Sequence, residues 1–286
     1  MLKRHPVWLN KKINFNKTTQ MQALLKKFDL NTVCQSAACP NIGECFADSE
    51  VTFMILGKHC SRNCSFCNID HLEPESVDYN ESCRIAEAVG ELRLKHVVIT
   101  SVTRDDLPDG GAEVFTDTVR NIKERSPDVT VEVLIPDFNL NRESLKIVID
   151  SKPDIIAHNL ETVDRLYQEV RPQADYRRSL EVLDIVKKKD RDIFTKSGLM
   201  LGLGEKEEEI LKAFDDLRAI ACDFLSIGQY LAPTLKHYPI SDYVEPKKFR
   251  EYKEQAISRG FSYVMSAPYV RSSYRAGEYL KEMVKF

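Results

Sequence analysis

The sequence predicts an α/β protein built as a partial (open) TIM-like barrel of about six βα units, with an extension at each end. Short apolar, β-rich runs alternate with amphipathic helical stretches from residue 51 onward, which is typical of a parallel sheet covered by helices. Polar loops follow most of the apolar runs, as expected where the carboxyl ends of barrel strands share a site. The length of 286 residues suits one α/β barrel domain.

Each element is predicted from its own spacing of apolar residues. The predicted strands are 51–56, 96–100, 129–135, 155–157, 193–198 and 224–227, with a further strand at 261–265. The predicted helices are 83–94, 114–124, 142–150, 178–188, 207–219 and 247–258, with a further helix at 19–28. The chain therefore divides into an N-terminal extension (1–50), a barrel (51–268) and a C-terminal extension (269–286).

Composition excludes several classes of protein. Hydrophobic residues make up 43% of the chain and charged residues 30%, which is typical of a soluble globular protein with a full core. A formal net charge of −3 predicts neither a nucleic-acid partner nor an anionic membrane surface. No apolar run approaches the roughly 20 residues that span a bilayer, and no apolar signal segment follows the basic N-terminus. We therefore expect a cytoplasmic protein.

Three cysteines, Cys60, Cys64 and Cys67, lie on the loop that leaves the first predicted strand. Three thiolates so close together form a compact soft-ligand site that suits an iron–sulfur cluster or zinc. A structural zinc site would add a fourth Cys or His at short spacing. The only local candidate is His59, which adjoins Cys60 so closely that the backbone hinders tetrahedral closure. This barrel triplet leaves one metal position open, which favours a chemical role over a structural one.

A second group of three, Cys34, Cys39 and Cys45, precedes the barrel. Pro40 and Gly43 disfavour one regular helix through all three cysteines, so we expect a loop around an inorganic core. Alone, this N-terminal triplet would also fit one half of a zinc site. Beside the barrel triplet, a second cluster is the favoured interpretation.

The distribution of the eight cysteines also favours metal binding. Six of them lie between residues 34 and 67 of a large chain with no predicted export signal, which disfavours a disulfide framework. The remaining two, Cys83 and Cys222, fall in a predicted helix and just before a predicted strand. We expect both to be small buried apolar residues.

Polar loops follow five of the predicted strands. Each loop alone is explained by turns and helix caps. Together, beside three cysteines at the end of the first strand, they predict one shared site at the carboxyl ends of the strands. These loops are Ser101–Asp106, Pro136–Phe138, His158–Glu161, Leu199–Glu205 and Gly228–Leu231.

The spacing Cys-x3-Cys-x2-Cys, with Phe66 before the last cysteine, resembles the signature of the radical S-adenosylmethionine (SAM) superfamily. Nearly the whole sequence resembles the lipoyl synthase family of that superfamily. The N-terminal triplet combined with the terminal Arg271-Ser-Ser-Tyr274 is the most specific part of the resemblance. The other matching segments are 54–57, 101–106, 110–111, 158–161, 170–172, 195–205 and 228–231.

The resemblance implies two 4Fe–4S clusters. The barrel triplet would hold the cluster that binds SAM, and the N-terminal triplet would hold an auxiliary cluster. A serine of the C-terminal extension would be the fourth auxiliary ligand, with Ser273 preferred over Ser272. Because an alkoxide is a harder ligand than a thiolate, it should leave iron more easily, which suits a cluster that gives up sulfide. Family members often have His at the position of Arg275, so its role stays open.

The implied activity is radical insertion of sulfur at C6 and C8 of an octanoyl chain carried on a lysine of a lipoyl-carrier domain. The auxiliary cluster would supply the sulfur and need rebuilding. The implied partners are octanoylated carrier proteins, a reducing electron donor and an iron–sulfur assembly or repair protein. Gly202 and Gly204 would allow close backbone approach to SAM. The candidate SAM contacts are Arg104, Asn159, Glu161, Arg171 and Lys196.

Three alternatives remain open at this point. Another sulfur-inserting radical SAM enzyme, of the biotin synthase or methylthiotransferase type, would keep the barrel triplet but would not explain the N-terminal triplet with a serine-bearing ending. A non-catalytic iron–sulfur carrier would show cysteines in fours and would need no barrel. A zinc-stabilised interaction module is the third alternative, and it would be colourless.

Overall fold

Seven parallel strands form one sheet in which each strand pairs with the next in the sequence, so β1 and β7 are its two edges. The computed structural model describes residues 6–10 and 18–283. The predicted open α/β barrel is therefore confirmed, and the further strand predicted at 261–265 is present as β7. The strands are β1 Thr52–Ile55, β2 His96–Ser101, β3 Thr130–Leu134, β4 Ile155–Ala157, β5 Phe194–Leu201, β6 Phe224–Gln229 and β7 Tyr263–Ser266.

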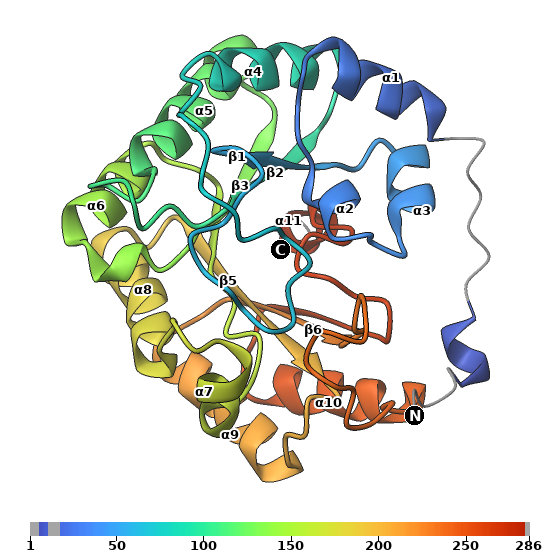
Figure 1. Ribbon diagram of the computed structural model, residues 1–286. Coiled ribbons are helices and arrows are strands. Elements are labelled where there is room, and N and C mark those ends of the chain that lie inside the picture. Colours follow the sequence, from blue (N-terminus) through green and yellow to red (C-terminus); the bar gives the residue numbers. More distant parts are fainter. Residues whose placement is uncertain (1–5, 11–17, 284–286) are drawn as a thin grey trace.

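Helices surround this sheet because the strands are buried on both faces and need apolar cover outside. Figure 1 shows the ring that runs from α4 through α5, α6, α8, α7 and α9 to α10. The helices of this ring are α4 Glu81–Leu92, α5 Ala112–Arg125, α6 Arg142–Asp150, α7 Tyr167–Val170, α8 Tyr176–Lys189, α9 Glu207–Ala219 and α10 Pro246–Ser258. Among the described residues, none of the helices combines the length and the apolar character that crossing a bilayer requires.

The remaining helices do not belong to this ring, and Figure 1 shows α11 near its centre. In Figure 1, α2 and α3 occupy the side where the ring of outer helices is open. Residues just before α2 cover the β1 edge, since Thr32 forms an antiparallel bridge with Phe53 and Met54 N–H donates to Asn31 O at 2.9 Å. The short helices are η1 Val7–Leu9, α1 Thr19–Lys27, α2 Val33–Ser36, α3 Ile42–Ala47, η3 Phe138–Leu140, η4 Asp164–Leu166 and α11 Gly277–Met283.

Two sequence predictions differ from the structure at element ends. The fifth and sixth strands are longer than predicted, because pairing of β5 with β6 continues through Met200 and Gly228. Leu199–Leu201 and Gly228–Gln229 therefore belong to strands rather than loops. Two cysteines of the N-terminal triplet lie on short helices, Cys34 on α2 and Cys45 on α3, while Cys39 lies on the turn between them. The Thr32 hydroxyl caps α2 by accepting from Gln35 N–H at 3.3 Å. Pro40 lies between α2 and α3, so no single helix crosses the triplet.

Candidate functional site

The loop that bears the barrel triplet begins with a left-handed turn. Leu56 has φ +70° and Gly57 has φ +95°, an arrangement that costs a non-glycine residue about 1–3 kcal/mol. Two buried charged side chains hold Leu56 in place. Its N–H donates to Glu81 at 2.9 Å, and its carbonyl accepts from Arg104 at 3.1 Å. This turn redirects the chain from the end of β1 towards the barrel mouth, the carboxyl end of the strands.

Backbone hydrogen bonds attach the triplet loop to three other parts of the barrel. Ser61 N–H donates to Thr103 O at 2.9 Å, and Thr103 N–H donates to the Cys60 sulfur at 3.3 Å. Ser65 N–H donates to Val170 O at 3.0 Å, while Ser65 O accepts from Tyr238 N–H at 2.8 Å. The loop is thus fixed on both sides while its thiols stay free of disulfides.

Arg62, between the first two cysteines of the barrel triplet, organises the loops after β2 and β3. Its guanidinium is only 5% exposed and forms ion pairs of 2.7 Å with both Asp105 and Asp137. Burial opposes ionisation of Asp137, yet the two-pronged contact with Arg62 holds the pKa of that carboxyl well below its usual range. A buried, fully paired network therefore orients the triplet loop.

The thiols of the barrel triplet lie close enough for their charges to interact. Burial raises the pKa of Cys67 to about 12, and the thiols of Cys64 and Cys60 add to the rise. Burial also raises the pKa of Cys64, although the nearby Arg171 opposes the change. Closely spaced thiols with raised pKa values, such as Cys64 and Cys67, favour a partner that accepts them as thiolates, as iron does.

The thiols of the N-terminal triplet interact in the same way. Burial raises the pKa of Cys34 to about 11, with the charge of Cys39 contributing. Burial raises the pKa of Cys45 well above its usual range, and Cys39 and Cys34 add to the effect. The structure thus brings each sequence-predicted triplet together.

The C-terminal segment, residues 269–283, packs against the helix that carries Cys45. Tyr274 donates its hydroxyl to Glu44 at 2.7 Å, and Arg275 forms an ion pair with Glu44 at 3.1 Å. The Asn41 amide donates to Tyr269 O at 2.7 Å. Arg275, whose role the sequence left open, therefore helps to fix the C-terminal segment to the N-terminal triplet.

The same segment also reaches the barrel mouth beside the other triplet. Arg271 lies near enough to both Cys39 and Glu161 for their charges to interact, although burial lowers its pKa. Glu161 in turn interacts with Cys64 and Cys67 of the barrel triplet. One side chain thus links the surroundings of both triplets.

The two adjacent serines of the segment have different surroundings. Ser272 accepts a hydrogen bond from the Asn159 amide at 2.5 Å. The Ser273 hydroxyl has no hydrogen-bond partner within the ranges 6–10 and 18–283. The next two residues, Tyr274 and Arg275, both contact Glu44 on the helix of Cys45, so a free hydroxyl in this segment fits a donor set of three cysteines and one serine.

No three His, Cys, Asp or Glu side chains of the described residues lie close enough together to hold a single metal ion. This geometry disfavours the single-zinc alternative. It agrees with a 4Fe–4S cluster, because each thiolate of such a cluster binds a different iron and the thiolates stand farther apart.

Three of the five candidate SAM contacts meet at the mouth. The Asn159 side-chain amide donates to the Glu161 carboxylate at 2.9 Å, and the Asn159 backbone carbonyl accepts from Arg171 Nη1 at 2.9 Å. Burial raises the pKa of Glu161, opposed by the nearby Arg171. Asn159 Oδ1 and Arg171 Nε are buried and have no hydrogen-bond partner among the described residues, and such orphaned groups commonly mark a ligand position.

The other two candidates are engaged elsewhere. Arg104 binds Asp106 and the Leu56 carbonyl. Lys196 has no exposed surface and forms an ion pair with Glu132 at 3.0 Å, nearer the start of the strands than the mouth. Among the predicted glycines, a Cβ at Gly202 would collide with protein atoms, the Asp242 carbonyl among them, so its packing alone explains the glycine.

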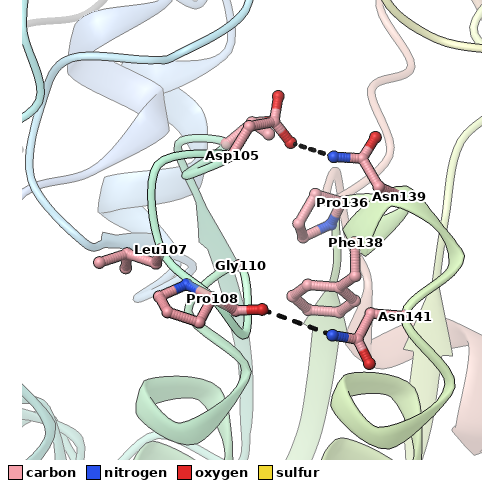
Figure 2. Close-up of a pocket in the computed structure, with 9 residues that line it drawn as sticks. Asp105, Leu107, Pro108, Gly110, Pro136, Phe138, Asn139 and Asn141 are labelled. Atoms are coloured by element: carbon pink, nitrogen blue, oxygen red, sulfur yellow. Dashed lines mark hydrogen bonds between the residues drawn. The ribbon is translucent and has the colours of Figure 1, made fainter.

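A pocket of about 280 Å³ lies beside the triplet loop, between the loops that follow β2 and β3. Figure 2 shows Asp105 and Asn139 joined by a hydrogen bond across its upper edge, with the Phe138 ring below. None of the six triplet cysteines lines it. The two loops meet as the sequence predicted, but the pocket adjoins the triplet loop and does not contain it.

Sequence reasoning missed the role of Arg62 and of Arg271. An arginine between cysteine ligands, and one directly before the paired serines, were the available signals. The prediction that Cys83 is buried is wrong, because it is exposed on α4 where it faces Asn121. The same prediction for Cys222 is confirmed, since that side chain is fully buried.

Comparison with known proteins identifies the family of this chain. The sequence profile of the Radical SAM superfamily matches residues 54–217. Lipoyl synthase of Alkaliphilus metalliredigens is 55% identical over 98% of this chain and 97% of that protein. Lipoyl synthase of Caldicellulosiruptor saccharolyticus is 53% identical over 98% and 99%, and that of Geobacter metallireducens is 54% identical over 96% and 97%.

Solved structures of low sequence identity share the fold. Streptococcus suis SuiB bound to S-adenosylmethionine matches with a TM-score of 0.60 at 14% identity, over 88% of this chain and 60% of that chain. Methylornithine synthase (PylB) matches with a TM-score of 0.56 at 13% identity, over 73% and 62%. The chain therefore belongs to the radical SAM superfamily and, within it, to the lipoyl synthase family.

Proposed function

We propose that this chain inserts sulfur at C6 and C8 of an octanoyl chain carried on a lysine of a lipoyl-carrier domain. Identity above 50% to lipoyl synthases over nearly the full length supports this reaction. The observation that carries the proposal is the position of Arg271, which lies within charge–charge reach of both Cys39 and Glu161. It supports a single pocket in which a radical source and a sulfur source face the same substrate.

We assign one 4Fe–4S cluster to each cysteine triplet. The barrel triplet would hold the SAM-binding cluster, with one iron free of protein ligands. The N-terminal triplet would hold the auxiliary cluster, with Ser273 as fourth ligand. Ser273 is preferred because its hydroxyl is free in the described structure, whereas Ser272 is bonded to Asn159.

A reduced cluster held by Cys60, Cys64 and Cys67 would supply the one-electron chemistry that C–H bonds without an acid–base handle require. The residues at the mouth bind and orient SAM. The free Asn159 Oδ1 is an acceptor that suits an ammonium group, and the free Arg171 Nε is a donor that suits a carboxylate. Glu161 adds a second acceptor near both. Arg104 and Lys196 become weaker candidates, because their charges are already paired.

The alternatives explain less of the molecule. An enzyme of the biotin synthase or methylthiotransferase type would use the barrel triplet but leave the N-terminal triplet, Glu44 and the C-terminal segment without a joint purpose. An electron carrier has no need for orphaned polar groups at the mouth of a barrel. A zinc-stabilised module needs four close ligands, and no such group occurs among the described residues.

The proposed reaction implies further partners and assigns separate roles to the barrel and to the two extensions. The partners are octanoylated carrier proteins, a reducing electron donor and an iron–sulfur assembly or repair protein that restores the consumed cluster. Residues 1–50 and 269–286 would together hold the auxiliary cluster, and residues 51–268 would hold SAM. Contacts of Tyr274 and Arg275 with Glu44 support this pairing of the two extensions.

The test uses reconstituted, reduced protein with SAM and an octanoyl-lysine peptide, analysed by mass spectrometry. The peptide should gain sulfur, and the protein should hold about eight irons per chain. Replacing the N-terminal triplet by alanines should leave about four irons and SAM cleavage, but no sulfur insertion. Cleavage of SAM by the parent protein without sulfur in the peptide would favour the biotin synthase or methylthiotransferase type of enzyme.

A further inference from the structure

The ring of Tyr279, on α11, closes the interior of the barrel below the proposed site. The side chain has no exposed surface, and its ring centre lies 4.0 Å from the Lys196 ammonium. Lys196 forms its ion pair with Glu132, which is also fully buried. Edge-to-face contacts join Tyr279 to Phe224 at 5.4 Å and to Tyr263 at 4.9 Å. The C-terminal segment is thus anchored to the starts of several strands.

A short, tightly hydrogen-bonded connection joins this anchor to Ser273. Residues 272–276 form consecutive turns that lead directly into α11. Tyr274 N–H donates to Arg271 O at 3.0 Å, and Tyr279 N–H donates to Ala276 O at 3.3 Å. A displacement of Tyr279 is therefore passed to Ser273 rather than absorbed by a flexible linker.

The other end of the segment is held by close packing. A Cβ at Gly228 would lie 2.0 Å from the Val270 carbonyl, so the segment rests directly on the β6 backbone. Ser272 is bonded to Asn159. Since the Ser273 hydroxyl has no partner of its own among the described residues, these attachments on either side set its position.

We propose that Tyr279 is a positioning residue for sulfur insertion: its ring on the buried Lys196–Glu132 pair holds the C-terminal segment so that Ser273 reaches the N-terminal triplet. This inference rests on the proposed function, because it assumes that Ser273 is the fourth ligand of the auxiliary cluster. It also accounts for Lys196, a residue at which the sequence predicted a SAM contact. Lys196 acts through the segment and not on SAM.

The phenolic hydroxyl has no hydrogen-bond partner among the described residues, so the ring alone should matter. Tyr279→Phe should therefore behave as the parent, whereas Tyr279→Met keeps apolar volume but loses the aromatic face. Tyr252→Met is a matched control, because Tyr252 is a buried tyrosine with a lysine ammonium 5.1 Å from its ring, away from the segment.

The first readout is the rate at which the reconstituted protein loses iron from its auxiliary cluster to a chelator, followed by absorption and electron paramagnetic resonance. Tyr279→Met should lose this iron about tenfold faster than the parent, because loss of the aromatic ring weakens one contact that holds the C-terminal segment. Tyr279→Phe and Tyr252→Met should match the parent, and the SAM-binding cluster should be unchanged in all of them. Equal rates in Tyr279→Met and the parent would overturn the proposal.

A second readout separates this proposal from the ligand assignment. Ser273→Cys should change the spectrum of the auxiliary cluster in the parent, because a thiolate replaces the alkoxide, and should change it much less in Tyr279→Met. No change in the parent would refute Ser273 as ligand, and with it the role of Tyr279. An equal spectral change in the parent and in Tyr279→Met would refute the positioning role of Tyr279 but leave Ser273 as the ligand.

If Tyr279→Met does not fold, a second variant tests whether α11 holds the C-terminal segment in place. Gly277 is the first residue of α11, and a Cβ there would lie 3.1 Å from the His96 Cβ. Gly277→Ala should therefore push α11 away from His96. Gly90→Ala, where the nearest atom would be 3.9 Å away, is its control. If Gly277→Ala loses auxiliary iron faster than the parent and Gly90→Ala does not, the result supports the anchoring of the C-terminal segment by α11. Equal rates in Gly277→Ala and Gly90→Ala would contradict it.

Discussion

Two adjacent serines of the C-terminal segment differ in their hydrogen bonding. Ser272 is tied to Asn159 at the barrel mouth, whereas Ser273 has no hydrogen-bond partner within the described ranges. We expect Ser273→Ala to abolish sulfur insertion while SAM cleavage continues, because only the auxiliary cluster loses a ligand. Ser272→Ala should weaken both activities by about 10–100-fold, as loss of a supporting contact does.

The measurement is the ratio of sulfur inserted to SAM cleaved, taken by mass spectrometry under anaerobic conditions. Ser258→Ala, which removes an exposed hydroxyl at the end of α10, is the control and should leave the ratio unchanged. If Ser272→Ala lowered that ratio and Ser273→Ala did not, the two serines would have to exchange roles.

His158, at the end of β4, should give the molecule a distinct sensitivity to acid. Its Nδ1 lies 2.8 Å from Ile135 O and its Nε2 has no partner among the described residues. Burial lowers the pKa of His158 from 6.5 to about 4, with the charge of Arg171 contributing. The unfolded chain therefore binds a proton between pH 6.5 and 4 that the folded chain does not.

Stability from this group is complete above pH 6.5 and is lost as the pH falls towards 4. The expected loss in the free energy of unfolding is up to about 1.4 kcal/mol per pH unit. Urea unfolding at pH 7, 6 and 5 should show a flatter pH dependence for His158→Gln than for the parent. Parallel curves would show that the histidine is not buried as a neutral ring.

The C-terminal segment depends on one glycine of the sixth strand. Any side chain at Gly228 would meet the Val270 carbonyl at 2.0 Å, a backbone atom that a rotamer change cannot move. Gly228→Ala should therefore lift the segment from β6, destabilise the fold by about 1–3 kcal/mol and stop sulfur insertion. Thermal unfolding and auxiliary-iron content measure both effects, and Gly90→Ala on α4 is the control. Normal auxiliary iron in Gly228→Ala would contradict this packing.

The buried ion pair between β3 and β5 also gives a prediction about the stability of the fold. Glu132 and Lys196 have no exposed surface and lie 3.0 Å apart. Lys196→Met removes the closest cation from the buried Glu132, whose other neighbour, the His96 ring, lies 3.7 Å away. This loss should cost about 3–5 kcal/mol of unfolding free energy. The double variant Lys196→Met, Glu132→Met removes both charges and should recover most of that loss. Equal destabilisation of the single and double variants in urea unfolding would refute the buried pair.

Across the whole molecule, the sequence predicted what depends on local pattern. The alternation of apolar runs and helices gave the open barrel, and the bounds of β4, α6 and α9 were predicted to the residue. The spacing of the cysteines predicted both triplets, which the structure brings together. These features are periodic or contiguous in the chain, so the sequence displays them directly.

What the sequence could not predict depends on contacts between distant residues. Lys196 follows a strand pattern like its neighbours, and only the fold shows that its charge faces Glu132 instead of the mouth. The extra length of β5 and β6 comes from their mutual pairing rather than from their own propensity. Arg275 pairs not only with the nearby Glu278 but also with Glu44, 231 residues away, and nothing near Arg275 in the sequence indicated that second contact.

The central claim is that the N-terminal triplet holds the sulfur that reaches the octanoyl chain. The most direct measurement reconstitutes the protein with heavy-isotope sulfide, removes free sulfide, and weighs the octanoyl-lysine peptide after a single turnover with SAM. The account predicts that the sulfur gained by the peptide is the heavy isotope, and that the protein whose N-terminal triplet is replaced by alanines transfers none. Transfer of labelled sulfur by that variant, or sulfur of ordinary mass in the product of the parent protein, would contradict it.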